Sequence, residues 1–311
     1  MDVQAPAPAV PVSLSRVGVT NVEKVTRIGR QLYYAKLDCF VDPGPEQEGA
    51  RESRFEGVVN DVIGEVMLGE APFKAEQLAR RIAVEVRERQ GALRADVTIA
   101  ARYPEHKPAP VSGIATQEIY TLLGAAVASA RGTRRLIGVA AQGMTASPDV
   151  QRLVAARSRE RLASGGFTDD QITDILDAVP VATDDQLGLG TLHLGLPQEC
   201  ETDVDAADLL AIVEASMSSE IYELMKRSDE GAVVEKAHRR PRFVEDCVEE
   251  AIRGALERYG DLRDDVFLSA RQENFESIHQ HSVVAERFGL MAELRGERSH
   301  YTTMREWLSA A

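Results

Sequence analysis

The residues best suited to chemistry lie close together late in the chain, within residues 273–281. Carboxylates and imidazoles alternate there with two apolar residues that burial would anchor: Glu273, Phe275, Glu276, Ile278, His279 and His281. Carboxylate combined with imidazole is typical of divalent-metal sites and of proton-transfer sites. Glu276 and His279 are three residues apart and would share one face of a helix. The alternative is a solvated acidic loop, or a helix start, that happens to carry histidines.

A second candidate is a basic cluster in an otherwise acidic chain, formed by Lys226 and Arg227 together with residues 236–240. Guanidinium and ammonium groups at this spacing suit a phosphate. The alternative is a solvated helix end whose positive charges complement the helix dipole. Glu245 lies at the start of the next predicted helix. Its carboxylate could stabilise that helix through the helix dipole, or it could accept two N–H donors such as those of a guanine edge.

Other familiar catalytic patterns are not present in the sequence. Gly188 and Gly190 are not followed by the rest of a dinucleotide or phosphate-loop motif. Ser147 would need a nearby base to act as a nucleophile, and no Ser-His-Asp signature accompanies it. The three cysteines are far apart, which argues against a disulfide framework or a thiolate zinc site.

Composition indicates a soluble globular protein of one large domain or two ordinary ones. The 311 residues are 44% hydrophobic and 28% charged, with a net charge of −14. No basic stripe offsets the acidity, so a nucleic-acid surface is not expected. The first residues lack a basic flank and an apolar core, no apolar run reaches membrane-spanning length, and a cytoplasmic location is expected.

Periodicity predicts strands and helices along most of the chain. Strands are expected over residues 15–21, 31–42, 93–103, 134–142, 191–196 and 265–271, and a strand or helix over 282–293. Helices are expected over residues 74–90, 112–130, 150–164, 168–178, 205–226 and 242–259. Pro104 and Pro108 are expected to end the third strand. Residues 146–149 are predicted to form a turn, 183–190 a polar loop, and 295–311 a marginal tail.

An internal repeat indicates how these elements are arranged. Residues 88–102 align without gaps on residues 257–271, with nine of fifteen positions identical. In each copy a helix ends at a glycine and a short link leads to a strand carrying Asp-Val. The repeat predicts a duplicated α+β module with antiparallel strands rather than a doubly wound parallel sheet.

Several short motifs carry a resemblance to a known family: SRVGVTN at 15–21, SRF at 53–55, GMT at 143–145, MSS at 217–219, LMKRSDE at 224–230, FVED at 243–246 and the stretch 273–281. Together the motifs resemble those of the GTP cyclohydrolases of type IB and the archaeal type IV (methanopterin-pathway) branch, over residues 12–290. The length of the segment between Gly143 and Gly190 is similar to that of the archaeal branch.

The resemblance implies a bimodular tunnelling fold of class α+β, with tandem β-β-α-α-β-β modules, an antiparallel sheet and helices on one face. It divides the chain into a flexible leader (1–13), a first module (14–145), a helical insertion with an active-site loop (146–190), a second module (191–292) and a tail (293–311). It also implies a homodimer or homotetramer with sites between subunits, and a hydrolase that opens the guanine ring of GTP at C8. The product would be a dihydroneopterin phosphate for methanopterin or folate biosynthesis. The cofactor would be a divalent metal, with Fe²⁺ favoured and Mn²⁺ or Zn²⁺ as alternatives.

The resemblance also assigns roles to residues of this chain. Catalytic roles fall to Ser147, Asp149, Asp184, Glu276 and His279. Substrate-binding roles fall to Glu245, Arg54, Lys226 and Arg227. The metal ligands would be His279, Glu230 and Asp184.

This chain departs from the family pattern at several of these positions. Ser147, Pro148 and Asp149 stand where the family has Cys-Pro-Cys, residues 184–187 replace His-Asn-Gln-Arg, and residues 51–52 replace His-Met. Oxygen ligands in place of thiolate and imidazole would favour Mn²⁺, Fe²⁺ or Mg²⁺ and would weaken the hold on zinc. The alternative is that the metal has been lost and the chain is a non-catalytic purine- or pterin-binding paralogue or partner subunit.

Overall fold

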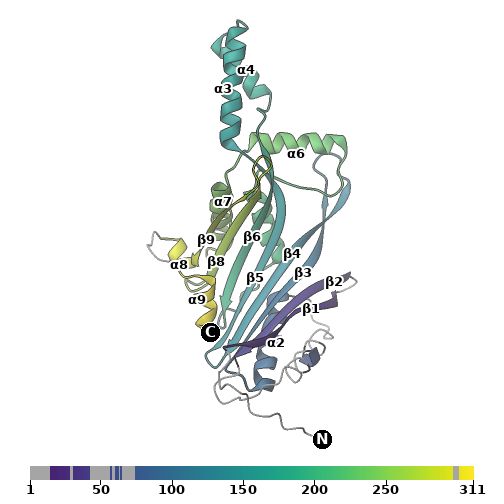
Figure 1. Ribbon diagram of the computed structural model, residues 1–311, viewed down its shortest axis with the longest axis vertical. Coiled ribbons are helices and arrows are strands. Elements are labelled where there is room, and N and C mark those ends of the chain that lie inside the picture. The colour runs from purple at the N-terminus through teal and green to yellow at the C-terminus, as the bar shows by residue number, and fades with distance from the viewer. Residues whose placement is uncertain are drawn as a thin grey trace.

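The computed structural model describes residues 15–28, 31–42, 57, 60–62, 64, 74–296 and 301–311. Within these ranges the chain forms one nine-stranded antiparallel sheet with helices packed on it (Figure 1). The strand order is β1-β2-β3-β4-β5-β6-β8-β9, and the short β7 pairs with β5 beside this path. The strands are β1 (Val17–Ile28), β2 (Gln31–Asp42), β3 (Arg94–Pro108), β4 (Ala115–Ser129), β5 (Gly132–Ala146), β6 (Asp185–Pro197), β7 (Ser219–Glu220), β8 (Phe267–Phe275) and β9 (Ser282–Leu290).

In both halves of the chain, helices lie between two pairs of strands. The helices are α2 (Ala75–Gln90), α3 (Pro148–Ser164), α4 (Asp169–Ala178), α5 (Ala206–Ser216), α6 (Arg227–Arg239), α7 (Val244–Arg258), α8 (Met291–Leu294) and α9 (Met304–Ser309). In the second half the order is β5, β6, α5, β7, α6, α7, β8, β9, with α3 and α4 inserted between β5 and β6. Every described helix is too short or too polar to cross a membrane.

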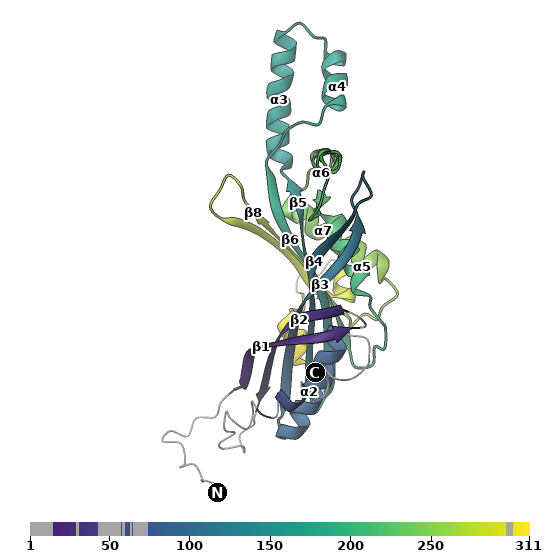
Figure 2. The same cartoon turned by 90° about the vertical axis from the view of Figure 1, so that its right-hand side faces the viewer.

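The two faces of the sheet carry different layers, because successive residues of a strand point to opposite sides. Ile137 packs into the main core beneath α2, α5 and α7, with Ile82, Leu209 and Val248 from those helices. Its neighbour Leu136 points the other way and belongs to a separate cluster. The main core therefore lies between the sheet and the three helices, which share one side of it in Figure 2.

The internal repeat predicted from the sequence is confirmed in three dimensions. Both copies run from the end of a long helix into a strand, α2 into β3 and α7 into β8. Gly91 ends α2 in the left-handed conformation (φ 60°), which costs glycine little. Equivalent ion pairs follow: Arg94 Nε lies 2.6 Å from Asp96 Oδ1, and Arg263 Nε lies 2.9 Å from Asp265 Oδ1. The predicted α+β class with tandem modules is thus confirmed.

The helix predicted over residues 112–130 is wrong, since this segment forms β4 between β3 and β5. Tyr120 and Leu122 are buried while Ile119 is exposed, the alternation of a strand. A Cβ on Gly124 would lie 2.3 Å from the backbone of Ala75, so α2 rests directly on this strand. The alanines and Gly124 of this segment suggest a helix, but their small size is what allows α2 to pack closely on the strand.

The end predicted for the third strand is also wrong, because β3 continues through both prolines and pairs with β4 as far as Pro108. On its other side the described pairing with β2 stops at Arg102. Pro104 and Pro108 thus fall where one edge of the strand is unpaired, the setting in which strands accommodate proline.

The single helix predicted over residues 205–226 is replaced by α5, β7 and a link to α6. α5 ends at Ser216, whose hydroxyl donates to the carbonyl of Val213 at 2.7 Å. Ser218 accepts the backbone N–H of Ala146 at 3.1 Å and so ties the chain to β5. Serine hydroxyls compete with helical hydrogen bonds in this way.

The C-terminal residues 301–311, predicted to be part of a marginal tail, instead pack on part of the second face of the sheet, over β4 and β8. Trp307 in α9 is 2% exposed and stacks on Phe267 with ring centroids 5.8 Å apart. Its indole N–H donates to the carbonyl of Asp265 at 3.0 Å. A Cβ on Gly195 would lie 2.8 Å from the Trp307 ring, so glycine makes room for the indole. The prediction of helices on one face holds for α2, α5 and α7 but not for α9.

The helices α3 and α4 form a hairpin that projects beyond the end of the sheet (Figures 1 and 2). Their predicted positions and the glycine pair between them are confirmed. α3 has no buried residue, whereas Ile172 of α4 is 2% exposed. Arg239 of α6 donates to the carbonyls of Asp177 and Ala178 and so holds the base of the hairpin.

Candidate active site

A polar corner forms where β5 ends and α3 begins. Ser147, predicted to lie in a turn, is instead the N-cap of α3, and its hydroxyl accepts the N–H of Val150 at 3.4 Å. Its own N–H donates to the carbonyl of Asp184 at 3.0 Å, and the Thr183 hydroxyl donates to the carbonyl of Ser147. The residue before β6 is therefore fixed beside the start of α3, although the hairpin separates them in sequence.

The turn between β8 and β9 reaches the same corner. The hydroxyl of Ser277 donates to Asp184 Oδ1. Glu276, the preceding residue, is half-buried. The segment is a hairpin turn and not a helix, so Glu276 and His279 do not share a helix face. Ser147, Asp184 and the Glu276–Ser277 turn are the sequence-predicted site elements that the structure brings together.

Two other candidates lie at the rim of this corner. His279 is exposed and stacks on His281, with ring centroids 5.2 Å apart and planes at 17°. Asp149, in the first turn of α3, is exposed and forms an ion pair with Arg152. Both side chains are accessible to solvent, and neither contacts Asp184 through a described hydrogen bond.

A chain of amide side chains leads from the core to Asp184, and the sequence analysis missed its inner members. Gln272 donates to Asn274 at 2.9 Å, Asn274 donates to Gln186 at 3.2 Å, and Gln186 donates to Asp184 Oδ2 at 3.3 Å. Gln272 and Asn274 are 2% and 4% exposed. Two amides at alternate positions of an otherwise apolar strand face are the signal that could have identified them. A Cβ on Gly188 would lie 2.4 Å from the Gln272 amide, so glycine admits this chain.

A histidine–carboxylate pair next to the corner was also missed. The imidazole Nε2 of His238 lies 2.9 Å and 3.1 Å from the two carboxylate oxygens of Asp185. Gln151 of α3 donates to the carbonyl of His238. The C-terminal end of α6 is therefore attached both to the start of β6 and to α3.

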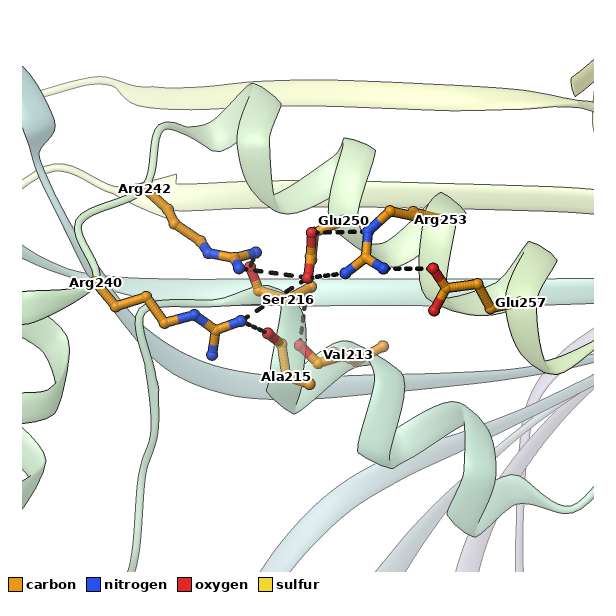
Figure 3. A network of polar contacts seen from close by, with 8 residues as sticks. All are labelled: Val213, Ala215, Ser216, Arg240, Arg242, Glu250, Arg253 and Glu257. Carbon is orange, nitrogen blue, oxygen red and sulfur yellow. Dashed lines mark hydrogen bonds and ion pairs between the residues drawn. The ribbon is translucent and has the colours of Figure 1, made fainter.

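An arginine network holds the other side of the corner in place (Figure 3). The backbone N–H of Arg242 donates to the carbonyl of Ala146, the residue before Ser147, at 2.9 Å. Its guanidinium donates to the carbonyl of Ser216 at 2.8 Å and pairs with Glu250 at 3.4 Å. Ion pairing with Arg253 lowers the pKa of Glu250, which keeps this carboxylate charged. Arg242 thus links the corner to the end of α5 and to the middle of α7.

The predicted basic cluster divides into two parts. Its later members are engaged: Lys236 with Glu220, Arg239 with Glu235, and Arg240 with the carbonyl of Ala215. Lys226 and Arg227 are exposed at the N-terminal end of α6, together with Glu230. α6 is about 20 Å long at 1.5 Å per residue, so these three lie far from the end that carries His238. The structure does not bring them to Asp184 within one chain.

The remaining predicted substrate residues are Glu245 and Arg54. Glu245 is exposed in the first turn of α7, three residues after Arg242, and lines a shallow groove with Ala285 and Arg287 of β9. It therefore lies at the same end of the sheet as Ser147. Arg54 lies outside the described residues.

A metal site does not form within the described part of one chain. No three His, Cys, Asp or Glu side chains converge there on a point that would hold an ion. His279, Glu230 and Asp184 are spread over the β8–β9 turn, the start of α6 and the start of β6. Cys39, Cys200 and Cys247 are free and buried, and burial raises the pKa of Cys39 and of Cys247 to about 12.

Comparison with known proteins gives matches over nearly the whole chain. Residues 1–285 match the family described as Type I GTP cyclohydrolase folE2. A protein of Methanococcus aeolicus named GTP cyclohydrolase MptA is 37% identical over 307 residues, which cover 95% of this chain and 98% of the relative. The protein of the same name from Methanosarcina mazei is 36% identical over 312 residues, covering 96% of this chain and 97% of the relative.

Solved structures with a similar fold include uricase from Arthrobacter globiformis, with a TM-score of 0.56 and 8% sequence identity. The match covers 96% of this chain and 99% of that chain. At this identity the likeness bears on the fold alone. It confirms the bimodular tunnelling fold expected from the sequence.

Proposed function

The chain belongs to the type I GTP cyclohydrolase family, and from this membership we propose that it hydrolyses the guanine imidazole ring of GTP at C8. Formate leaves from C8, and the remaining product is a dihydroneopterin phosphate for pterin biosynthesis of the methanopterin or folate type. The observation that carries the proposal is the meeting of the Ser147 corner, Asp184 and the β8–β9 turn at one end of the sheet.

The side chains of this corner suit a reaction that adds water to a ring and then moves protons. Asp184 accepts hydrogen bonds at both carboxylate oxygens, from Ser277 and from Gln186, and is therefore held in one orientation. Glu276 precedes Ser277 on the β8–β9 turn and is half-buried. We assign proton transfer to Asp184 and Glu276, because positioned carboxylates act as general acids and bases. The hydroxyl of Ser147 would help orient the attacking water.

The outer residues have roles at the rim of the site. His279 is exposed on the same turn as Glu276 and would enter proton transfer once substrate covers it. Asp149 would act together with its partner Arg152 at the mouth of the site. Glu245 would hold the guanine edge through its carboxylate, as two parallel hydrogen bonds to one carboxylate are both strong and directional.

The residues that would bind phosphate point to a site shared between two copies. Lys226 and Arg227 are exposed cations at a helix N-terminus, an arrangement that favours phosphate. They lie at the end of α6 remote from Asp184, so a second copy would present them to the corner. β1 and β9 form the two outer edges of the described sheet, and such edges favour pairing with another chain. We propose a homodimer or homotetramer on this basis, with Arg54 as a further phosphate ligand.

A divalent metal, Fe²⁺ in the first place and Mn²⁺ or Zn²⁺ as alternatives, belongs to the same proposal. The described residues of one chain do not fit such an ion by themselves. Asp184, Glu230 and His279 would have to come together from more than one copy to ligate it. The catalytic and binding roles proposed above are therefore assigned to amino-acid side chains, and none of them depends on a metal.

The proposal is tested by incubating the purified oligomer with GTP, anaerobically, with Fe²⁺, Mn²⁺, Zn²⁺ or chelator. Formate release and a fluorescent neopterin after oxidation are the expected products. Elemental analysis of the protein as purified gives the metal content independently of turnover. GTP binding without formate under every condition would overturn the catalytic proposal and identify the chain as a purine-binding paralogue.

A further inference from the structure

A cavity of about 570 Å³ lies on the helix face of the sheet, where the two modules meet. The first turn of α2 forms one wall, and the start of α5 with the end of α7 forms the opposite wall. Its floor is provided by β3, β4 and β5. Ser147, Asp184, Glu245 and Glu276 do not line it, so this cavity is separate from the candidate active site.

Three tyrosines give the cavity an aromatic lining. Tyr103 and Tyr120 lie side by side on the floor with ring centroids 5.0 Å apart, and Tyr259 faces them from the end of α7. Burial raises the pKa of Tyr120 and of Tyr259, so both rings remain neutral. Neutral aromatic rings attract cations through the negative charge of their faces.

The charged residues around the cavity are predominantly acidic. Six carboxylates line it, against two cations: Glu76, Glu105, Asp203, Asp205, Asp208 and Asp261 against Lys74 and Arg258. Both cations are already engaged, Lys74 with Asp203 and Arg258 with Asp208 at 2.7 Å. Within the described residues, Glu105, Asp205 and Asp261 form no ion pair, so the wall retains an excess of negative charge.

Glu76 provides an independent indication that the cavity takes a ligand. The residue is 3% exposed, lines the cavity, and its Oε2 has no hydrogen-bond partner among the described residues. Burial raises the pKa of Glu76, and the two nearby cations are engaged elsewhere, because Lys74 pairs with Asp203 and Arg135 donates to the carbonyl of Cys200 at 2.7 Å. A buried carboxyl oxygen without a partner is rare in native proteins and is destabilising. A donor supplied by a bound molecule would satisfy it.

We propose that this cavity binds an extended organic cation with two or more protonated amino groups, of the polyamine class. One ammonium group would donate to Glu76 Oε2, and a second would lie near Glu105 and the rings of Tyr103 and Tyr120. The carboxylates surround the cavity rather than converge, and no three of them form a metal-ligand group in the described chain. Charges spread over a cavity of this size match a flexible polyamine better than a compact ion.

Isothermal titration calorimetry of the whole protein with spermidine tests the proposal. A chain with a net charge of −14 also attracts polyamines non-specifically, so the titration is run in 150 mM NaCl and repeated with Mg²⁺. The variants Glu76→Gln and Glu105→Gln each replace one lining carboxyl group by an amide while keeping the side-chain shape. Asp174→Asn is the matched control, because Asp174 is exposed on α4, away from the cavity.

We expect saturable binding near one spermidine per chain, weakened about tenfold by Glu76→Gln, as loss of one charge-assisted hydrogen bond predicts. Glu105→Gln should weaken it less, and Asp174→Asn should leave it unchanged. Glu76→Gln keeps the volume of the buried side chain, so the variant should retain its thermal midpoint, which shows that it is folded. The proposal would be overturned if spermidine did not bind, or if all variants bound it equally. It would also be overturned if Mg²⁺ at the same charge concentration displaced spermidine equally well.

Discussion

The hydroxyl of Ser277 donates a hydrogen bond to Asp184 Oδ1, although the two residues are 93 positions apart in the chain. Ser277 lies in the turn between β8 and β9, and Asp184 lies just before β6. Because β6 and β8 are antiparallel neighbours in the sheet, the start of β6 lies beside the end of β8. This contact joins the histidine-containing turn to the Ser147 corner and defines the candidate active site.

Asp184→Asn should reduce GTP turnover strongly. The amide keeps the shape of the side chain but cannot accept or release the proton, and general acid–base groups contribute about 10²- to 10⁴-fold. We expect kcat/KM for formate release to fall by about 10²-fold or more. Ser277→Ala, which frees the carboxylate without removing it, should have a smaller effect. Asp174→Asn serves as the control, and equal activity of Asp184→Asn and this control would exclude a catalytic role for Asp184.

Asp229 should make stability depend on pH. Burial alone would raise its pKa, but hydrogen bonds from the backbone and hydroxyl of Ser112 and from the N–H groups of Lys226 and Val111 hold the pKa well below its usual value. A depressed folded-state pKa gives stability that is present above the unfolded-state pKa, about 3.9, and is lost as pH falls toward the folded value. These bonds attach the β3–β4 turn to the start of α6.

We therefore expect Asp229→Asn to lower the urea midpoint at pH 7. The difference from the unaltered protein should be constant down to about pH 5 and should narrow below pH 4. Unfolding followed by circular dichroism across this range provides the measurement. Asp261→Asn, at an exposed site, is the control. A difference that grows as pH falls would contradict the assignment.

Much of the fold could be predicted from the sequence, because local signals and tertiary structure agree. The repeat at residues 88–102 and 257–271 gave the duplicated module, since its helix end, link and strand are all encoded within fifteen residues. β4 could not be recognised in this way. Its alanines and Gly124 suit a helix locally, and only the packing of α2 on the strand explains them.

The candidate site could be predicted only in part, for a similar reason. Residue types drew attention to Glu276 and Ser147, but the contact between Ser277 and Asp184 depends on strand order, which no local pattern encodes. The basic cluster had the right composition for phosphate, yet most of its side chains pair with carboxylates or cap helices. Because α6 is about 20 Å long, Lys226 at its start lies far from Asp184 in the same chain.

Trp307→Ala should destabilise the whole domain, although the residue lies four positions from the end of the sequence. The indole fills a pocket against Phe267, lies under the guanidinium of Arg134 (4.9 Å to the ring centroid), and donates to the carbonyl of Asp265. Truncating a buried tryptophan costs about 3–5 kcal/mol. Chemical denaturation followed by circular dichroism measures the loss, since the variant has no tryptophan. Arg305→Ala on the exposed side of α9 should change stability by less than about 0.5 kcal/mol, and equal effects of the two would contradict packing of α9 on the sheet.

Ile172→Ala should loosen the projecting hairpin without unfolding the body. Ile172 is 2% exposed and packs in a hairpin whose other helix, α3, has no buried residue, so little else holds the two helices together. Hydrogen exchange should therefore quicken over residues 150–178 while protection in β4 and β5 stays the same, because local opening needs less free energy than global unfolding. Leu153→Ala is the control, since Leu153 is 66% exposed on α3 and contributes little packing. A parallel loss of protection in the sheet would instead mean that the hairpin and the domain unfold as one unit.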